Sequence, residues 1–405
     1  MTYEEIYKLL EKHGQTQLLK YYGELTEEEK RVLFSDIEKT DFSIVGNIKN
    51  KGVKKLGRLA PVGAVTKEEI KRRKRLFEEV GLGVLREGKV GAVLLAGGQG
   101  TRLGYSGPKG TFDMGLTRSL SIFGLQFENI KSVAAKAGRH FPVFVMTSTV
   151  NNDETVKFFE ENNFFGYPDD RVFFYIQDLS PVCGYDGKIF LSEKNRVALA
   201  PNGNGGWYSS LIGSGLGKVI DEENIEWLNI YSVDNVLQKI CDPVFIGATV
   251  MKNCRCGAKV VKKVSAEEKV GVLCTEDGKP TVVEYYEMPD EFKSMEKDGE
   301  LVFGYGVILN YLFGVRELNN TLGGKLPYHL AEKAVPHIEN GVKVAAKEPC
   351  GYKFETLVVD MIKLTGSCLA YEVEREKEFA PVKNATGADS VDTARELLIK
   401  NGVTL

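Results

Sequence analysis

The sequence predicts an α/β fold with a mixed, mostly parallel central sheet flanked by helices. Residues 90–95 form a short apolar run, which is typical of a strand buried on both faces. Helical and strand patterns then alternate as far as residue 176, as they do in repeated βαβ units. The 405 residues exceed what one hydrophobic core usually serves, so we expect a large α/β domain with a smaller part attached.

An N-terminal helical region is expected before this sheet. Apolar residues recur there at helical spacings, and Thr26 followed by three glutamates is a typical helix start. The run at 71–75 is the most basic in the chain, but glutamates flank it on both sides within one helical pattern. We therefore interpret this run as a solvated helix face and not as a nucleic-acid-binding surface.

Periodicity and turn signals predict the later elements. Helices are expected at 119–136, 153–162, 207–212 and 391–400, and strands at 142–147, 172–176 and 225–233. From residue 243 onward the pattern changes to period two, with strands at 270–274 and 281–286 around a turn at 276–279. This segment is expected to form an antiparallel ribbon beside the sheet. The domain organisation that we predict is a helical region at 1–85, a core at 86–345 and a C-terminal part at 346–405 that completes the core.

Composition and charge exclude several classes of protein. With 53 basic and 56 acidic residues, the net charge of −3 gives no field that would attract nucleic acid or an acidic membrane. No apolar run approaches the ~20 residues of a membrane span, and the acidic N-terminus does not resemble a signal peptide. Seven cysteines, an odd number, favour reduced thiols over a disulfide framework. We therefore expect a cytoplasmic protein.

The strongest functional signal lies directly after the first strand, in residues 96–109. Glycines allow the backbone to approach a ligand closely and to turn its N–H groups toward negative charge; they are Gly97, Gly98, Gly100 and Gly104. Arg102 and Lys109 add full positive charges, so the loop favours phosphate groups. It matches neither the dinucleotide fingerprint, because Leu103 stands where a glycine is required, nor the P-loop pattern. A purely structural turn is the alternative.

Two later segments also carry ligand-binding signals. Residues 201–206 combine three glycines with two asparagines, more than a turn requires, which favours close approach to a ligand. Asp234 follows the strand predicted at 225–233, where a carboxylate is a natural Mg²⁺ ligand, although Asp-Asn also makes turns. With four histidines and no hydrolase or metalloprotease motif, the remaining donors, cations and carboxylate suit phosphoryl-type transfer.

Eight segments, spread from about residue 10 to the C-terminus, carry a resemblance to a known family. They are the loop at 95–104 with 108–110, and residues 13–19, 201–206, 231–235, 257–261, 282–285, 351–355 and 378–384. In these segments the chain resembles the eukaryotic-type UDP-sugar pyrophosphorylases, most closely the UDP-N-acetylglucosamine pyrophosphorylases. The resemblance implies a Rossmann-like nucleotidyltransferase fold of the GT-A-like type, with the catalytic core at 86–345.

The resemblance also implies roles for individual residues. UTP would be held by Leu95, Ala96, Gly97, Gly98, Lys109, Gln177, Gly203 and Asp234, with Gln177 reading the uracil edge. The sugar would contact Asn204, Glu284 and Tyr285, and Asp234 would hold the cofactor Mg²⁺. The catalytic cations would be Arg102, Lys109, Lys353 and Lys383. The first two would take the charge of the departing pyrophosphate, and the last two would hold the attacking phosphate or the α-phosphate.

The activity that the resemblance implies is that of a uridylyltransferase. UTP and a hexose 1-phosphate would give pyrophosphate and a UDP-sugar, with UDP-N-acetylglucosamine as the expected product. These four molecules are the expected partners; we expect no nucleic acid and no membrane, and infer no obligate protein partner, which suits a monomer. The chain also ends soon after Asn384, so the extra C-terminal domain of longer family members is expected to be absent.

One departure from the family pattern concerns the sugar. Where the family usually has Phe-Asn-Ala-Gly-Asn-Ile, residues 303–308 read Phe-Gly-Tyr-Gly-Val-Ile, and Val307 cannot make the hydrogen bonds of an amide. This departure keeps a UDP-glucose or broad-specificity UDP-sugar pyrophosphorylase open as an alternative. A UDP-sugar-binding regulator without catalysis is the alternative from a different class.

Overall fold

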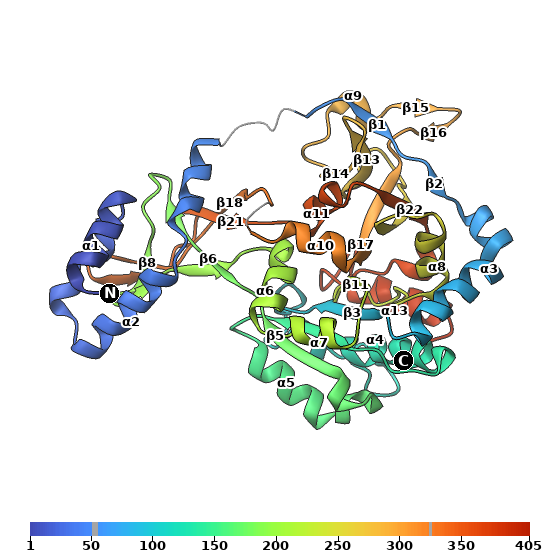
Figure 1. Cartoon of the computed structure of the whole chain (residues 1–405), viewed down its shortest axis with the longest axis horizontal. Helices are drawn as coiled ribbons and strands as arrows, with labels where there is room; N and C mark the ends of the chain where they lie inside the picture. The colour runs from blue at the N-terminus through green and yellow to red at the C-terminus, as the bar shows by residue number, and fades with distance from the viewer. Residues whose placement is uncertain (51–55, 324–325) are drawn as a thin grey trace. The chain divides into compact units, whose positions relative to one another are not determined.

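The computed structural model describes residues 1–50, 56–323 and 326–405 (Figure 1). The chain forms two compact units. The smaller unit consists of Met1–Val53, Asp178–Gly206 and Leu326–Val358, and the larger unit of Lys54–Gln177, Trp207–Lys325 and Val359–Leu405. Each unit is therefore assembled from three separate segments of the chain. The boundaries predicted from the sequence, at 1–85, 86–345 and 346–405, stay predictions.

An eleven-stranded sheet forms the centre of the larger unit. Its main path runs in the order β2 (Ala64–Val65), β22 (Cys368–Glu372), β12 (Cys256–Lys262), β17 (Tyr305–Gly314), β11 (Trp227–Ser232), β3 (Val90–Leu95), β4 (Val143–Thr147) and β5 (Val172–Ile176). Neighbours on this path are parallel except at β17, which is antiparallel to both β12 and β11. The predicted mixed, mostly parallel sheet is thus confirmed.

The predicted alternation of strand and helix between residues 90 and 176 is also confirmed. α4 (Ile122–Ala137) connects β3 to β4, and α5 (Asn152–Glu161) connects β4 to β5. The side chain of Ser121 accepts the N–H of Gly124 at the start of α4, and Gly138 ends the helix in the left-handed conformation at φ 70°. Every residue of β3 and β4 is buried, as a sheet covered on both faces requires.

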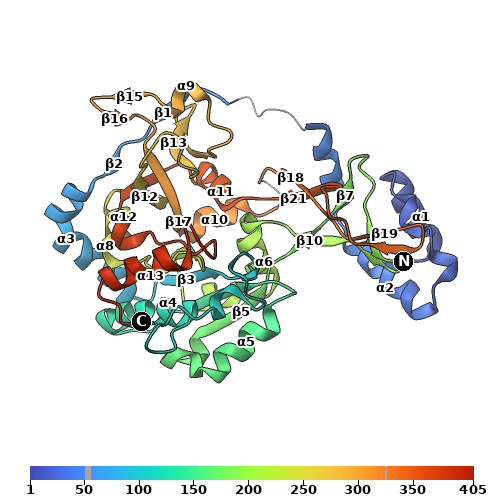
Figure 2. The ribbon, with the colours of Figure 1, turned by 180° about the vertical axis from the view of Figure 1, so that it is seen from behind.

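Most of the remaining helices are short. They are α6 (Trp207–Gly213), α7 (Gly217–Glu222), α9 (Asp290–Lys293), α10 (Val315–Leu318), α11 (Val358–Thr365), α12 (Arg375–Glu378) and α13 (Val391–Lys400). The helices predicted at 207–212 and 391–400 are present as α6 and α13. A capping box at Ser390 starts α13. The last residue, Leu405, accepts the N–H of Thr117, which precedes α4, and Figure 2 shows this end of the chain beside α4. Among the described residues, none of the helices has both the length and the apolar character needed to cross a membrane.

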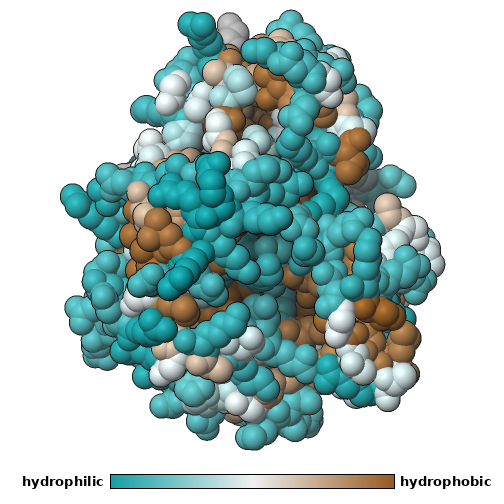
Figure 3. Space-filling model, turned by 90° about the vertical axis from the view of Figure 1, so that its right-hand side faces the viewer, coloured by the Kyte–Doolittle hydropathy of each residue, from teal (hydrophilic) through white to brown (hydrophobic). Residues whose placement is uncertain are grey.

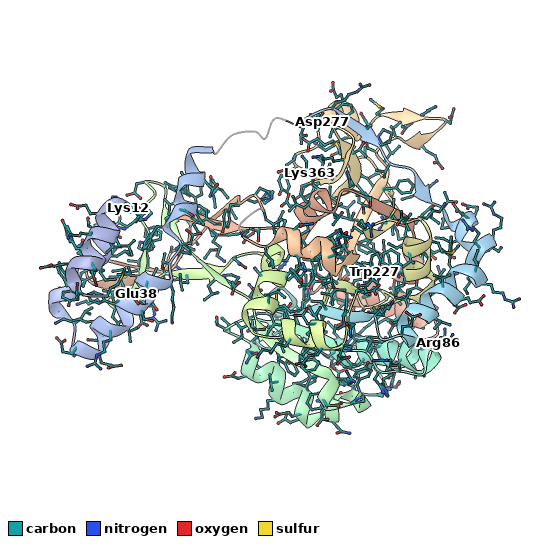
Figure 4. All side chains as sticks on the ribbon, in the orientation of Figure 1. Lys12, Glu38, Arg86, Trp227, Asp277 and Lys363 are labelled. Atoms are coloured by element: carbon teal, nitrogen blue, oxygen red, sulfur yellow. The ribbon has the colours of Figure 1, made fainter. Side chains whose placement is uncertain are left out.

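The predicted antiparallel ribbon is formed by β13 (Val272–Glu276) and β14 (Lys279–Val283). Asp277 and Gly278 join the strands, and both have positive φ, as a two-residue type I′ hairpin requires; Figure 4 labels Asp277 at this turn. The second strand ends at Val283 and not at residue 286. The carbonyl of Glu284 accepts the N–H groups of the residues three and four positions later, so the chain turns there instead of extending the ladder.

β17 carries an irregularity where it passes β12. Ala258 of β12 pairs with Tyr311, whereas Val260 pairs with Val307, so three residues of β17 face one residue of β12. Leu309 in this bulge has a φ of 53°, a left-handed conformation that L side chains rarely adopt. At its other end β17 contacts the ribbon through Gly306, which pairs with Val272. β17 therefore joins the ribbon to the central sheet.

The smaller unit combines N-terminal helices with short strands. α1 (Tyr3–Lys12) and α2 (Glu27–Lys39) both begin with a capping box, the latter at Thr26 as predicted. The strands are β6 (Leu179–Pro181), β7 (Cys183–Gly184), β8 (Leu191–Glu193), β9 (Arg196–Val197), β10 (Leu199–Pro201), β18 (His329–Lys333), β19 (His337–Glu339), β20 (Val342–Val344) and β21 (Gly351–Glu355). Gln15 connects the two parts, because its amide donates to the carbonyl of Gly187 and accepts the N–H of Ile189, each at 2.9 Å.

The basic run at 71–75 lies on α3 (Lys67–Arg86), whose last residue Arg86 is labelled in Figure 4. Four of its five side chains are exposed and the fifth, Arg73, pairs with Glu69, so the prediction of a solvated helix face is confirmed. α3 packs against α8 (Pro243–Met251), and Figure 2 shows the two helices side by side. Gly81 and Gly247 form this contact. A Cβ atom would meet the carbonyl oxygen of Pro243 at 1.9 Å in the first case and that of Phe77 at 1.8 Å in the second.

We predict that Gly81→Ala destabilises the protein by about 3 kcal/mol or more, because the new methyl group must push α8 away through backbone atoms. The matched control is Gly83→Ala on the same helix, where nothing lies within 4 Å of the added Cβ. This second change should stabilise the protein by about 0.5–1 kcal/mol, since alanine is the better helix former. Urea denaturation of both variants tests the pair, and equal effects would contradict the close contact.

Candidate active site

The loop predicted to bind phosphate follows β3 and folds back on itself. The N–H of Lys109 donates to the carbonyl of Gly98 at 3.1 Å, and the N–H of Gly100 donates to that of Gly107 at 3.0 Å. Gly104 takes the left-handed conformation at φ 70° between these two arms. Leu95, the last residue of β3, is buried, and the N–H of Ala96 still pairs with Met146 of β4. The loop therefore begins where the sheet ends and is held at both arms.

Gln177, the residue predicted to read uracil, lies against this loop. It follows β5 directly, and its N–H donates to the carbonyl of Thr147 at the end of β4. An ideal Cβ on Gly97 would meet the amide oxygen of Gln177 at 2.7 Å, so only glycine leaves this side chain its position. The structure thus brings Gln177 next to the predicted UTP loop. Its contact with uracil stays a prediction.

Lys109 and Asp234 form the central ion pair of the site. β3 and β11 are parallel neighbours with Leu95 opposite Ser232, so the residues that follow them meet at one edge of the sheet (Figure 1). The ammonium group of Lys109 lies 2.7 Å from Oδ1 of Asp234. The lysine side chain is 7% exposed, whereas the aspartate side chain is 33% exposed. The pair is therefore open to solvent from the aspartate side.

Lys383 is brought to the same edge by its neighbours. The N–H of Val382 donates to the carbonyl of Asp234 at 2.8 Å, and the side chain of Asn235 bonds both the carbonyl of Glu378 and the N–H of Ala380. The segment after β11 is therefore joined to the segment at 378–382 at several points. The ammonium group of Lys383 itself lies 3.2 Å from a carboxylate oxygen of Asp389.

Glu284 and Val307 lie together at the ribbon. An ideal Cβ on Gly271 would lie 3.3 Å from Oε1 of Glu284 and 3.5 Å from Cγ2 of Val307, so both side chains line one small space. Tyr285 is partly exposed and makes an edge-to-face contact with Tyr286 at 5.1 Å. Because β17 pairs Asn310 with Tyr231 of β11, Val307 lies beyond the end of β11, on the edge that carries Asp234.

Three predicted residues belong to the smaller unit and are described within it. Gly203 has a φ of 85°, and a Cβ there would meet the carbonyl oxygen of Thr356 at 2.3 Å. The side-chain oxygen of Asn204 accepts the N–H of Val358 at 2.9 Å, which leaves its amino group as the donor for a ligand. Lys353 lies on β21 opposite Ala331 of β18. Their contacts with UTP, sugar and phosphate stay predictions, as does that of the exposed Arg102 in the loop of the larger unit.

The sequence analysis missed the buried amides that support the site. Asn151 donates to the carbonyls of Ala96 and Gly98 at 2.9 and 3.3 Å, and therefore holds the base of the phosphate loop. Gln238 and Gln126 donate to the carbonyl of Ser232, where β11 turns toward Asp234. All three side chains are at least 97% buried. No local pattern marks such residues, because their partners lie elsewhere in the chain.

The metal prediction rests on Asp234. Its partly exposed carboxylate is a hard oxygen ligand, and Mg²⁺ is commonly held by one or two carboxylates together with substrate phosphates and waters. Within the described residues, no cluster of three or more His, Cys, Asp or Glu could hold a metal by itself. The residues present thus fit a Mg²⁺ ion that arrives with the nucleotide, and do not fit an ion held in an all-protein cage.

Parallel strands that end beside a glycine-rich loop place this chain among the α/β proteins that bind nucleotides at the carboxyl edge of their sheet. The sequence model described as UTP–glucose-1-phosphate uridylyltransferase matches residues 47–399, and the chain belongs to this family. As a member, it is a UTP:sugar-1-phosphate uridylyltransferase. The family and the class of enzyme that the sequence analysis predicted are confirmed.

Individual relatives match over nearly the whole chain. The human UDP-N-acetylhexosamine pyrophosphorylase-like protein 1 is 36% identical over 98% of this chain and 84% of its own length. The UDP-N-acetylglucosamine pyrophosphorylase of Saccharomyces cerevisiae is 32% identical over 96% of this chain and 88% of its own length. Among solved structures, the uridine diphosphate N-acetylglucosamine pyrophosphorylase of Trypanosoma brucei superposes with a TM-score of 0.82. It is 27% identical and covers 98% of this chain and 84% of its own.

We predict that Asp234→Ala destabilises the free protein more than Lys109→Met does, by about 1 kcal/mol or more. The first change leaves a buried ammonium group unpaired, whereas the second leaves a carboxylate that water can reach. Methionine keeps the apolar stem of the lysine, so lost packing does not obscure the comparison. Free energies of unfolding in urea provide the measurement. The double variant should recover part of the loss, and a larger effect of Lys109→Met would contradict this asymmetry.

Proposed function

We propose that the chain forms UDP-N-acetylglucosamine and pyrophosphate from UTP and N-acetylglucosamine 1-phosphate. An oxygen of the sugar phosphate attacks the α-phosphorus of UTP in line, a new P–O bond forms, and the bond to the β-phosphate breaks. The attacking phosphate is already ionised near neutral pH, so no residue has to remove a proton. The buried Lys109 paired with Asp234, at the edge where β3 and β11 end, is the observation that carries this proposal. The names of the relatives support the choice of sugar.

The cations of the site stabilise charge during the transfer. Lys109 and Arg102 take the negative charge that grows on pyrophosphate, and Lys353 and Lys383 hold the attacking phosphate or the α-phosphate. Asp234 would hold Mg²⁺, which when bound would neutralise phosphate charge. Lys109 can follow the phosphate groups during the transfer, because the lysine stem is flexible.

Binding of UTP uses the loop together with residues of other segments. The backbone of Leu95, Ala96, Gly97 and Gly98 holds the nucleotide together with Lys109, Gln177 pairs with the uracil edge, and Gly203 packs against the nucleoside. Asn204, Glu284 and Tyr285 face the sugar. UTP, the sugar 1-phosphate, the UDP-sugar and pyrophosphate are the ligands of this site. Function as a monomer in the cytoplasm is part of the same proposal.

We predict that Lys109→Ala and Asp234→Ala each lower turnover about 10²–10³-fold, since each removes a charge contact used in the transition state. Pyrophosphate release from UTP, Mg²⁺ and N-acetylglucosamine 1-phosphate is the measurement. Lys157→Ala is the control, because this lysine is exposed on α5 and, among the residues that the structure describes, forms an ion pair with Glu161 alone. Turnover near the wild-type rate in either site variant, with the fold intact, would contradict the assigned roles.

A second candidate, a UDP-glucose or broad-specificity pyrophosphorylase, is favoured by Val307, which lies beside Glu284 and offers no hydrogen bond. A panel of sugar 1-phosphates distinguishes it from the first proposal. Absence of turnover together with tight UDP-sugar binding would instead indicate a regulator without catalysis.

We predict that Val307→Asn raises kcat/KM for N-acetylglucosamine 1-phosphate relative to glucose 1-phosphate by about tenfold, the value of one added hydrogen bond to a ligand. The ratio of the two specificity constants is the measurement, so a general loss of activity does not affect it. Val264→Asn, at an exposed position after β12, is the control. An unchanged ratio in Val307→Asn would place Val307 outside the sugar pocket.

A further inference from the structure

The larger unit contains a cavity that the proposed reaction does not use. Its volume is about 720 Å³, within the range of small-molecule sites. It lies between the first half of α3, the residues before α8, and the segment that leaves β22 and forms α12. Five lysines line it: Lys67, Lys71, Lys74, Lys239 and Lys377. Figure 3 views the side of the molecule where α3 lies and shows mostly hydrophilic side chains around a hollow.

The buried carboxylates of this cavity are already bound. Glu378 contacts Lys259 at 2.5 Å and Lys239 at 3.2 Å, and Asp242 contacts Lys259 and caps α8 through the N–H of Val244. Glu372 accepts the N–H of Lys67 and lies 3.7 Å from its ammonium group. Burial alone would raise the pKa of Asp242, but the ammonium groups of Lys259 and Lys239 lower it below its ordinary value, so this carboxyl is ionised.

The lysines, in contrast, reach the solvent. The side chains of Lys67, Lys239 and Lys377 are 44–56% exposed. Lys71 and Lys74 are also exposed, lie on one face of α3, and make no ion pair with any of the described residues. Glu378 raises the pKa of Lys239, which therefore stays charged at neutral pH. With the buried Lys259, six ammonium groups belong to the cavity. Its five carboxylates are those of Glu68, Asp242, Glu372, Glu374 and Glu378, so one positive charge is in excess.

The walls of the cavity also include apolar groups. Ile70, Val244, Tyr371 and Val373 line it between the charged residues. The ring of Tyr371 packs on Phe245 at 5.1 Å, so this wall is fixed to α8. A ligand that suits the cavity thus carries negative charge for the two unpaired lysines and an apolar or aromatic part for the wall.

The back of this cavity is connected to the proposed active site. Lys239 and Asp242 belong to the same segment that begins at Asp234, and Glu378 begins the segment that ends at Lys383. The carbonyl of Glu378 accepts the side chain of Asn235, the neighbour of Asp234. Any ligand that moves Lys239 or Lys377 therefore acts on the two segments that carry the proposed metal ligand and a phosphate-binding lysine.

We propose that this cavity binds a small organic phosphate, a phosphate monoester with an aromatic or apolar part, and that its occupancy adjusts the position of Asp234 and Lys383. Binding is independent of the proposed function, whereas the effect on turnover rests on it. The site is separate from the UTP loop, because none of its lining residues belongs to residues 95–109.

Pyridoxal 5′-phosphate is a suitable probe because it is an aromatic phosphate monoester that also marks lysines. Its aldehyde condenses with a neutral amine and releases water, and borohydride reduces the imine to a stable secondary amine. Peptide mapping then identifies the labelled residue. Labelling at Lys71, Lys74, Lys239 or Lys377 that an excess of phenyl phosphate prevents would support the proposal. Labelling that is confined to other lysines, or that phenyl phosphate does not prevent, would overturn it.

Matched charge reversals on α3 test the site without disturbing the fold. Lys71→Glu with Lys74→Glu should weaken binding of the probe about tenfold or more at low salt, whereas Arg72→Glu with Arg75→Glu should change it less than about twofold. The control residues are exposed on the same helix and do not line the cavity. Equal weakening in both variants would indicate a general field of the helix and would overturn the site.

The kinetic arm tests the connection to the active site. Without borohydride, the probe should change the KM for UTP at least about twofold in the wild type and in the arginine variant, but not in the lysine variant. The same change in all three proteins would place the effect at Lys109 and overturn the connection. If the chain showed no uridylyltransferase activity at all, the proposed function would fail, while labelling and binding would still decide the cavity.

Discussion

The parallel pairing of β3 with β11 is the constraint on which the site depends. It brings Leu95 opposite Ser232, so that a loop of glycines and cations and a turn with a carboxylate start from the same edge. The residues that follow the two strands are therefore brought close together at this edge. A buried ammonium group next to a half-open carboxylate is the result, and it is stable only because the two charges compensate each other.

The sequence was sufficient for the elements whose signal is local. Apolar runs located β3, β4 and β5, and the capping residue Thr26 located the start of α2. It did not predict that β17 would enter the sheet between β12 and β11, because strand order depends on pairing between residues far apart in the chain. The same limit applies to the site. Lys109 and Asp234 could be found from motif and position, but Asn151 and Gln238 act through backbone carbonyls of other segments.

The composition of the smaller unit could not be predicted from the sequence either, because it combines segments that are far apart in the chain. Its helices were predicted, but their partners are the chain segments at 178–206 and 326–358. The buried side chain of Gln15 donates to the carbonyl of Gly187 and accepts the N–H of Ile189, so it satisfies two backbone groups of this turn. The motif around Gln15 is thus explained by packing and hydrogen bonding within the unit, and it needs no ligand to account for it.

The bulge in β17 separates two parts of the strand that pair with different neighbours in different registers. Residues beyond Tyr311 keep strict register with β11 and β12, whereas the residues up to Val307 pair with β12 in a register shifted by two positions. The left-handed Leu309 between them absorbs the difference. We therefore expect a change of side chain at Val307 to leave the pairing of β17 with β11 undisturbed. The residues of β17 near Val307 can therefore influence substrate preference, while the residues from Tyr311 onward keep the geometry of the central sheet.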